Sequence, residues 1–230
     1  MKRILSIALL AFTSVGVASA EGSSVAKLNE RIAAAHAVLH ELMDTPDKGV
    51  PLDIAAKATC VAVVPGFKKG AFLVGAQYGQ GVATCRTAKG WSAPVFIQIT
   101  GASFGFQAGG ESTDLVLVGV NHRSMDDMLK EKVKLGGDIA AAAGPVGRDS
   151  QAASGVLANA EFLTYSRSKG LFAGVDLTGD VINQNQGDTE SYYGADVPYQ
   201  KVLSGAVPTK AGSVHFVRTV NEMFREGKAR

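Results

Sequence analysis

The sequence is poor in charged and aromatic residues and holds only two cysteines. Charged residues make up 19% and aromatic residues 7% of its 230 residues, whereas apolar residues make up 46%. The apolar content, with a net charge of only +2, excludes a disordered chain. The glycines follow no three-residue period, which excludes a collagen-like chain. This length and composition predict one globular domain, or at most two small ones, with a sizeable core.

The chain has one long hydrophobic run, which lies at its N-terminus. Two basic residues precede an apolar stretch from Ile4 to Val17, and a small-x-small pattern typical of signal-peptidase sites ends at Ala20. A membrane anchor is the alternative, but the run is shorter than the roughly 20 residues that span a bilayer. We therefore interpret residues 1–20 as a cleaved signal peptide and residues 21–230 as a single domain, and we expect a periplasmic or secreted protein.

The mature chain that this cleavage would leave has no net charge. The signal peptide carries two basic and no acidic residues, so 21 of each remain. A neutral chain is not attracted as a whole to nucleic acid or to an anionic membrane, and any such contact has to come from a local cluster. We expect no nucleic-acid partner.

The two cysteines, Cys60 and Cys85, both lie at ends of predicted strands. In an oxidising compartment a disulfide bond between them is favoured, and two buried free thiols are the alternative. A metal site is not indicated, because two cysteines without a nearby histidine do not complete a zinc-ligand set. No cysteine stands at the predicted cleavage site to accept a lipid anchor.

The hydrophobic pattern predicts an α+β fold. Apolar residues recur at helical spacing over residues 24–44 and 213–226, and shorter helices are expected. These shorter helices are at residues 51–58, 122–134 and 198–203. Between Cys60 and Val120, short apolar runs alternate with glycine, proline and serine, which predicts short and mostly antiparallel strands. A second β region is expected over residues 137–182.

The 27 glycines concentrate in these predicted strands. Glycines in strands mark bulges, tight bends or the close approach of another backbone. They therefore predict a strongly curved, barrel-like sheet flanked by helices from both ends of the chain. A glycine-rich phosphate cradle is the functional alternative.

Several short patterns resemble catalytic or metal-binding motifs, but their surroundings do not fit. Residues 101–105 match the G-x-S-x-G nucleophile elbow around Ser103, yet no helix is predicted after the serine. Ser166 and Lys169 match S-x-x-K, which requires a helical turn where strand-forming residues stand. His36 and His40 are four residues apart on the first predicted helix, without a specified third ligand. We therefore expect neither an enzyme nor a bound cofactor.

Two basic spots in apolar surroundings remain as candidate binding residues. Lys68 and Lys69 are expected at a turn beside Phe72, and a second pair of cations follows about a hundred residues later. The second spot consists of Arg167 and Lys169, beside Phe172. Cations next to exposed aromatic rings can contact a lipid headgroup while the rings enter the membrane interface. Ordinary solvated turns flanked by core residues are the alternative.

Several long motifs in order resemble the SYLF domain family. They include GWSAPVFIQITGASFGFQAGGESTDLVLVGVN at residues 90–121, AAAAGPVGR at 140–148 and YSRSKGLFAGVDLTGDVI at 165–182. With the YYG at 192–194, the resemblance covers roughly residues 27–205. The chain is thus identified as a SYLF-like domain of the bacterial envelope branch.

The resemblance implies a non-catalytic phospholipid-binding protein. Members in yeast, plants and animals bind phospholipids, notably phosphoinositides, and some yeast members bind actin. In eukaryotic relatives part of the lipid contact comes from an N-terminal amphipathic helix, to which residues 24–44 would correspond. We expect a phospholipid or membrane surface as the partner, contacted through the two basic spots. The alternative is a structural or protein-interaction module of the envelope with a protein partner.

Overall fold

Two long antiparallel strands dominate the computed structural model, which describes residues 23–44, 49–136, 140–146, 160–168, 171–194 and 197–226. They are β1 (Cys60–Thr87) and β3 (Val95–Gly119). Their pairing runs from Cys60 opposite Gly119 to Ala83 opposite Val95, with irregularities near residues 64–67 and 71–73. We call this pair the ribbon. The prediction of several short strands in this region was wrong, because the glycines lie within continuous strands instead of ending them.

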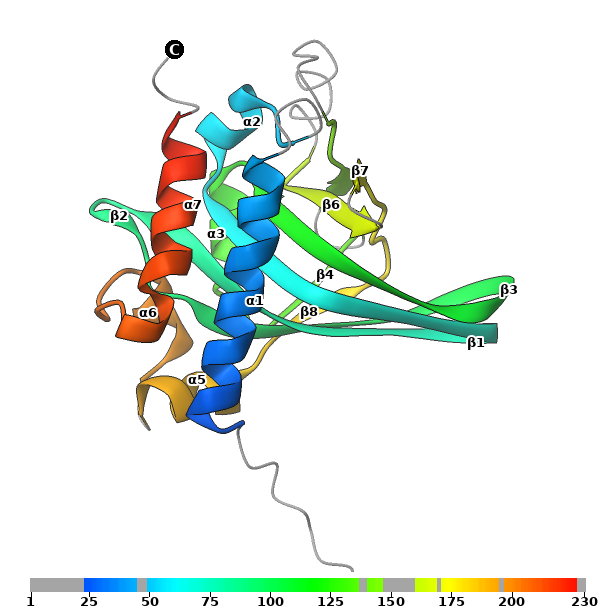
Figure 1. Ribbon diagram of the computed structural model, residues 1–230, viewed down its shortest axis with the longest axis horizontal. Coiled ribbons are helices and arrows are strands. Elements are labelled where there is room, and N and C mark those ends of the chain that lie inside the picture. Colours follow the sequence, from blue (N-terminus) through cyan, green and yellow to red (C-terminus); the bar gives the residue numbers. More distant parts are fainter. Residues whose placement is uncertain are drawn as a thin grey trace, which may run out of the picture.

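The ribbon folds back on itself, so that both ends of β1 meet. The Cα atoms of Cys60 and Cys85 are 4.0 Å apart, and a disulfide bond joins the two residues, which confirms the predicted pairing. Figure 1 shows the middle of the ribbon projecting far from the rest of the molecule. Its outer end comprises residues 68–78 of β1 and 100–112 of β3.

Glycine allows the two halves of β1 to pack closely. A Cβ atom at Gly81 would lie 2.1 Å from the carbonyl oxygen of Val63, and one at Gly79 would lie 2.6 Å from Val64 Cγ1. Contacts this short exclude any side chain there. The predicted close approach of another backbone is therefore confirmed at these positions, and the approaching backbone belongs to the same strand.

Six shorter strands extend the ribbon into an eight-stranded sheet curled like half a barrel. On β3, residues Asp114–Gly119 pair with β6 and residues Ile97–Thr100 pair with β8. Most pairs are antiparallel, as predicted, but β5 runs parallel to β6. The short strands are β2 (Gly90–Trp91), β4 (Lys132–Lys134), β5 (Ala141–Ala143), β6 (Phe162–Ser168), β7 (Leu171–Gly174) and β8 (Val181–Gln184).

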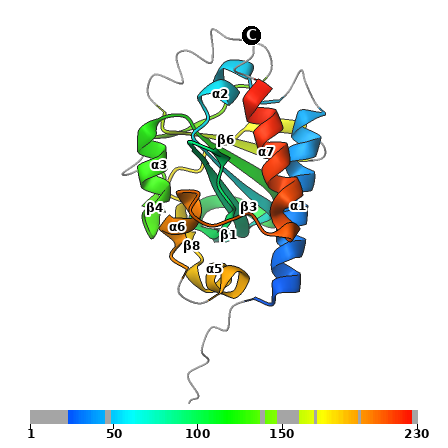
Figure 2. The ribbon, with the colours of Figure 1, turned by 90° about the vertical axis from the view of Figure 1, so that its left-hand side faces the viewer.

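Helices cover both sides of the curled sheet, as Figure 2 shows. On one side α1 (Val25–Met43) and α7 (Val214–Glu226) lie side by side and pack with the sheet around one hydrophobic cluster. On the other side α3 (His122–Met128) and α6 (Tyr199–Leu203) lie beside a second cluster. Among the residues that the structure describes, the remaining helices are α2 (Leu52–Lys57), α5 (Gln186–Tyr193) and the 3-10 turn η1 (Ala211–Ser213). The α+β class with helices from both chain ends is confirmed.

Two helix predictions need correction. The helix expected over residues 122–134 ends at Met128, and Lys132–Lys134 instead form β4, which pairs with β8. The helix α5 was not predicted, because its sequence QGDTESYY has no apolar stripe. The Asn185 side chain caps it by accepting a hydrogen bond from the backbone N–H of Asp188.

Candidate functional site

Lys68 and Lys69 lie within β1, at the base of the outer end of the ribbon, and not at a turn as predicted. Lys68 is exposed and Lys69 is half-buried. As consecutive strand residues they point to opposite faces of the ribbon. The Nζ atom of Lys69 lies 5.9 Å from the ring centre of Phe67, which is itself buried. The first basic spot therefore offers one fully solvated cation and a second one held over a core ring.

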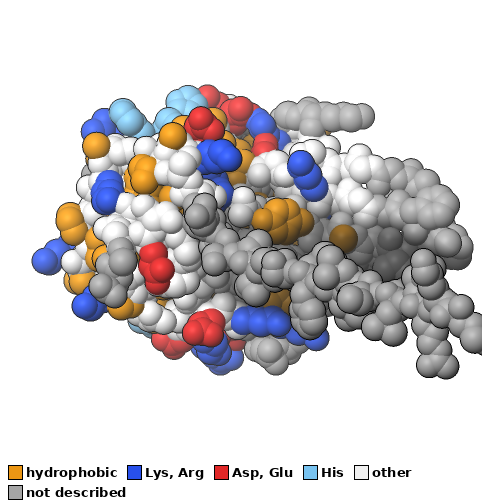
Figure 3. Space-filling view, turned by 90° about the horizontal axis from the view of Figure 1, so that it is seen from below, with side chains coloured by type: hydrophobic (Ala, Val, Ile, Leu, Met, Phe, Trp, Pro, Cys, Tyr) orange, Lys and Arg blue, Asp and Glu red, His pale blue; other side chains and the backbone are white. Residues whose placement is uncertain are grey.

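The part of the ribbon that follows Lys69 on β1 and precedes Glu111 on β3 carries no charged residue up to Cys85 and from Val95. Residues 70–85 and 90–110 contain no Lys, Arg, Asp or Glu, and Tyr78 is 46% exposed. Phe72 belongs to residues 71–74, whose side chains lie outside the described part of the structure, as do those of residues 103–109. On the face seen in Figure 3, positive and negative side chains of the described residues are intermixed. The outer part of the ribbon is thus an uncharged projection whose base carries two lysines and, opposite Lys69, Glu111.

The second predicted basic spot is not a free cationic surface. Arg167 forms ion pairs with Glu41 and with Asp114, the latter at 2.7 Å between Nη2 and Oδ2. Phe172 is only 4% exposed and belongs to the core, which corrects the expectation of an exposed ring. Lys169 lies outside the described residues. Of the second spot, the structure therefore describes one paired arginine and one buried ring.

Arg167 nevertheless lies close to Lys68 on the same face of the sheet. Lys68 is opposite Ser112 on β3, and Arg167 is opposite Asp114, two residues further along that strand. Residues two apart in a strand share a face. The fold thus brings part of the two spots together, but the charge of Arg167 is already neutralised by its two carboxylate partners.

Asp180 is a buried carboxyl group that the sequence analysis did not identify. It is 1% exposed, and neither of its carboxyl oxygens has a hydrogen-bond partner among the described residues. Its Oδ1 occupies the space where a Cβ atom at Gly101 would stand, 1.6 Å from that position. Burial raises the pKa of Asp180 to about 6, against the opposing effect of Lys69 and with a further increase from Asp176. An ionised carboxylate here costs stability at neutral pH.

The N-terminal helix α1 is held in the fold by its apolar stripe. The members of this stripe are almost completely buried against the sheet and α7: Leu28, Ile32, Ala35, Val38, Leu39 and Leu42. Arg31 on this helix forms an ion pair of 2.6 Å with Asp188 of α5. No helix in the described ranges is long and apolar enough to cross a membrane. In this structure the apolar side of α1 serves the core.

The catalytic motifs lack the backbone geometry that their chemistry requires. Ser103 lies inside β3, which continues to Gly119, so no strand-turn-helix elbow forms there. Ser166 lies in β6 and not on a helical turn. No described group of three or more His, Cys, Asp or Glu side chains is arranged to hold a metal ion.

The fold adds a third histidine beside the predicted pair. The ring centre of His36 lies 6.1 Å from those of His40 and of His215 on α7. Burial, followed by the neighbouring His215 and His40, lowers the pKa of His36. His36 therefore resists protonation at the contact between α1 and α7.

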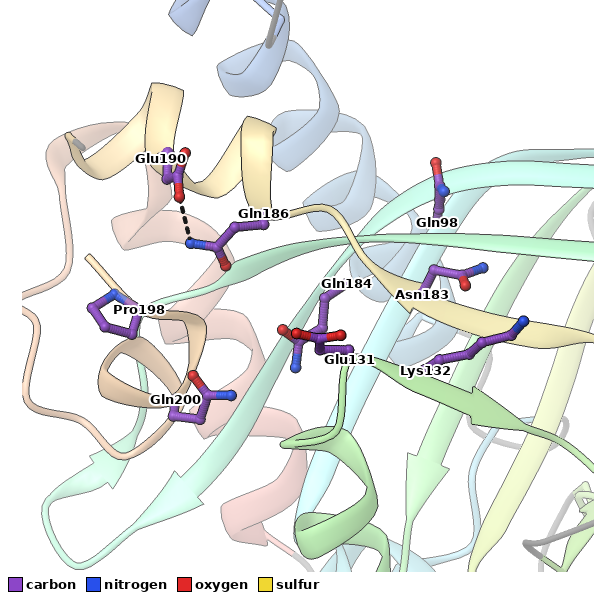
Figure 4. A pocket seen from close by; sticks show the side chains of 9 residues that line it. All are labelled: Gln98, Glu131, Lys132, Asn183, Gln184, Gln186, Glu190, Pro198 and Gln200. Atoms are coloured by element: carbon purple, nitrogen blue, oxygen red, sulfur yellow. Dashed lines mark hydrogen bonds between the residues drawn. The ribbon is translucent and has the colours of Figure 1, made fainter. Parts of the chain in front are cut away.

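An open hollow of about 720 Å³, lined mainly by polar side chains, lies where β8 and its neighbours β3 and β4 meet α5 and α6. Figure 4 shows its side chains, which come from separate segments that only the fold brings together. The lining residues are Gln98, Glu131, Lys132, Asn183, Gln184, Gln186, Glu190, Pro198 and Gln200. No local sequence signal could have identified this set, because its members span more than a hundred positions.

Comparison with known proteins identifies relatives over most of the chain. Residues 100–223 match the family described as "Ysc84: Las17-binding protein actin regulator". The chain is 35% identical over 178 residues to the SH3 domain-containing YSC84-like protein 1 of Rattus norvegicus, covering 76% of this chain and 52% of the relative. The human protein of the same name is 36% identical over 168 residues, covering 72% and 49%.

A fungal relative gives a similar result. LAS seventeen-binding protein 3 of Saccharomyces cerevisiae is 35% identical over 166 residues, which cover 70% of this chain and 36% of that protein. The chain thus spans about half the length, or less, of the curated relatives that it matches. The family description names a Las17-binding actin regulator, and the name of the yeast relative describes a LAS seventeen-binding protein.

Proposed function

The chain belongs to the Ysc84 family, also called the SYLF family, and we propose that it is a non-catalytic protein that binds phospholipid membranes. The proposed contact surface is the outer end of the ribbon. The observation that carries this proposal is the projecting ribbon itself. Residues 70–85 of β1 and 95–110 of β3 carry no charge, and the base of this uncharged part holds the exposed Lys68 and, opposite Lys69, Glu111. A lysine near an anionic membrane surface contributes about 1 kcal/mol of attraction.

The backbone of the ribbon is compatible with contact at a lipid interface. The two strands satisfy each other's N–H and C=O groups along their shared edge, and polar backbone groups without partners are costly in an apolar medium. The outer end contains Phe72, Leu73 and Val74 on β1, and Phe104 and Phe106 on β3. This composition suits an interface in which apolar residues meet acyl chains while the lysines stay among headgroups.

The proposed location is outside the cytoplasm, in the periplasm or the medium. The predicted signal peptide over residues 1–20 and the disulfide between Cys60 and Cys85 support it. In this setting the partner would be the surface of an envelope membrane.

Co-sedimentation with vesicles of mixed phosphatidylglycerol and phosphatidylcholine tests the proposal. Charge reversal at both ribbon lysines, Lys68→Glu with Lys69→Glu, should weaken binding at least tenfold, since attraction is replaced by repulsion at two positions. The matched control reverses Lys132 and Lys134, which are exposed on β4 and change the net charge equally. Absence of binding by the unaltered protein, or equal losses in the two double variants, would refute the proposal.

A protein-binding role is the second candidate, and the family match favours it. Relatives are named for binding Las17 and for regulating actin, so a protein partner of this chain is a reasonable alternative to a lipid. Recovery of one stoichiometric protein partner, from a preparation whose organic extract contains no phospholipid, would support this role. Phospholipid retained without such a partner would refute it.

A further inference from the structure

The hollow in Figure 4 does not include the outer end of the ribbon, and its volume lies in the range typical of small-ligand sites. It is lined by Gln98 from β3, by side chains from β8 and α5, and by residues in or next to β4 and α6. Pro198 is the one apolar residue among those that line it. Carbon atoms of the polar side chains still form about half of the lining, but the hollow is open to solvent and holds no large apolar side chain that would enclose a lipid tail.

The amide groups of the hollow have a fixed orientation, because their nitrogen atoms donate to groups that can only accept. Gln184 Nε2 donates to the backbone carbonyls of Leu129 and Lys130, at 3.2 and 2.8 Å. Gln200 Nε2 donates to the same carbonyl of Leu129 at 3.2 Å. A carbonyl oxygen cannot donate, so the amide oxygens of both glutamines are left as acceptors.

Two further amides repeat this arrangement. Asn183 Nδ2 donates to the hydroxyl of Thr100 and to the carbonyl of Val181, at 3.2 and 3.4 Å. Gln186 Nε2 donates to a carboxylate oxygen of Glu190 at 2.9 Å, a bond drawn in Figure 4. Both amide donors of Gln184 and Asn183, and one each of Gln186 and Gln200, are thus occupied within the protein, and the amide oxygens of all four remain acceptors.

The net charge of the lining, like its hydrogen-bond acceptors, favours a cationic ligand. Glu131 and Glu190 contribute two negative charges, and Lys132 contributes one positive charge. In Figure 4 the Lys132 side chain extends away from the Glu131 carboxylate. A phosphate or carboxylate ligand would meet oxygen acceptors and net negative charge, whereas a cationic donor is attracted by both.

We propose that this hollow binds a small aliphatic polyamine. An ammonium group has three N–H donors and no acceptor, which complements a lining of amide and carboxylate oxygens. Several ammonium groups on one linear chain match acceptors that are spread over β3, β8 and α5. The site is independent of membrane binding and does not involve residues 68–78 of β1 at the outer end of the ribbon.

Isothermal titration of the whole mature protein with spermidine at low salt is the direct test. Spermidine should bind at one site per chain, more tightly than a monoamine such as butylamine, and the affinity should fall as salt is added. Glu131→Gln should weaken spermidine binding about tenfold, because a charge-assisted hydrogen bond becomes a neutral one. Glu222→Gln, a matched change at an exposed position on α7, should leave the affinity unchanged.

A second variant separates binding from folding. The side chain of Gln98 is half-buried and forms no hydrogen bond with the described residues. Gln98→Leu therefore removes an acceptor without breaking a side-chain hydrogen bond. This variant should bind spermidine more weakly while its thermal midpoint stays unchanged. Equal affinity for an uncharged polyol such as sorbitol, tighter binding of a tri-lysine peptide, or full spermidine affinity in Glu131→Gln and Gln98→Leu would overturn the proposal.

Discussion

Replacement of Asp180 by asparagine should stabilise the protein at neutral pH. Asp180 is buried, its two carboxyl oxygens have no hydrogen-bond partner in the described part of the chain, and its pKa is raised to about 6. A group whose pKa is higher in the folded than in the unfolded state binds protons more tightly when folded. Ionisation of Asp180 therefore lowers the free energy of unfolding. This cost is absent below the unfolded-state pKa of 3.8 and is complete above the folded-state pKa of about 6.

The size of the effect follows from the difference between the two pKa values. Each pKa unit corresponds to about 1.4 kcal/mol, so a rise from 3.8 to about 6 gives an upper limit of about 3 kcal/mol at neutral pH. Asn has nearly the same shape, so it still fits against Gly101, where the Oδ1 atom replaces a missing Cβ. For a chain of this length the gain corresponds to a thermal midpoint about 6 to 12 °C higher.

Urea unfolding at pH 7.5 and pH 4 measures this gain. Trp91 is the single tryptophan and is buried, so its fluorescence reports the global transition. Asp180→Asn should raise the free energy of unfolding at pH 7.5 and change it little at pH 4. The matched control is Asp176→Asn, which should destabilise at pH 7.5, because hydrogen bonds from Thr178 lower the pKa of Asp176. A stability gain of the same size at both pH values, or a loss in Asp180→Asn at pH 7.5, would refute the reasoning.

Three further outcomes can be checked by the same unfolding measurements. Gly81→Ala should destabilise by about 3 kcal/mol, since the new methyl group overlaps a backbone carbonyl, whereas Gly70→Ala, with nothing within 4 Å, should not. Cys85→Ser should lower stability by about 3.5 kcal/mol through loss of the loop closed with Cys60, and reduction of the unaltered protein should match it. His36 has a lowered pKa, so its protonation opposes folding below pH 6.5, and His36→Gln should reduce the loss of stability on acidification from pH 7 to pH 5.

The parts of the fold that depend on local patterns could be predicted from the sequence. The apolar spacing of α1 and α7 gave both helices nearly to the residue. The strand lengths could not be predicted, because Gly79 and Gly81 look like strand breaks when only their neighbours in sequence are considered. Their purpose becomes visible only when Val63 and Val64, from the other half of the same strand, are seen packed against them.

The candidate site was predictable only in part. Lys68 was identified correctly as an exposed cation, since a polar pair between apolar strand residues marks the surface. Arg167 looked equally available, and its partners Asp114 and Glu41 are 53 and 126 positions away, beyond any spacing rule. The sequence around Asp180 did not indicate a buried carboxyl group, because Asp180 packs against Gly101 of β3, which is distant in sequence.

The disulfide has a consequence for how the protein would respond to proteolysis. Both cysteines belong to β1, so the bond turns the whole outgoing and returning course of that strand into a covalent ring. A single cut at any peptide bond between Cys60 and Cys85 leaves one connected molecule, whose two pieces separate only after reduction. A cut in the companion strand β3 lies outside the ring and divides the chain at once. The two strands of one projection thus differ in their tolerance of a break, and the protected strand is the one that carries the lysines.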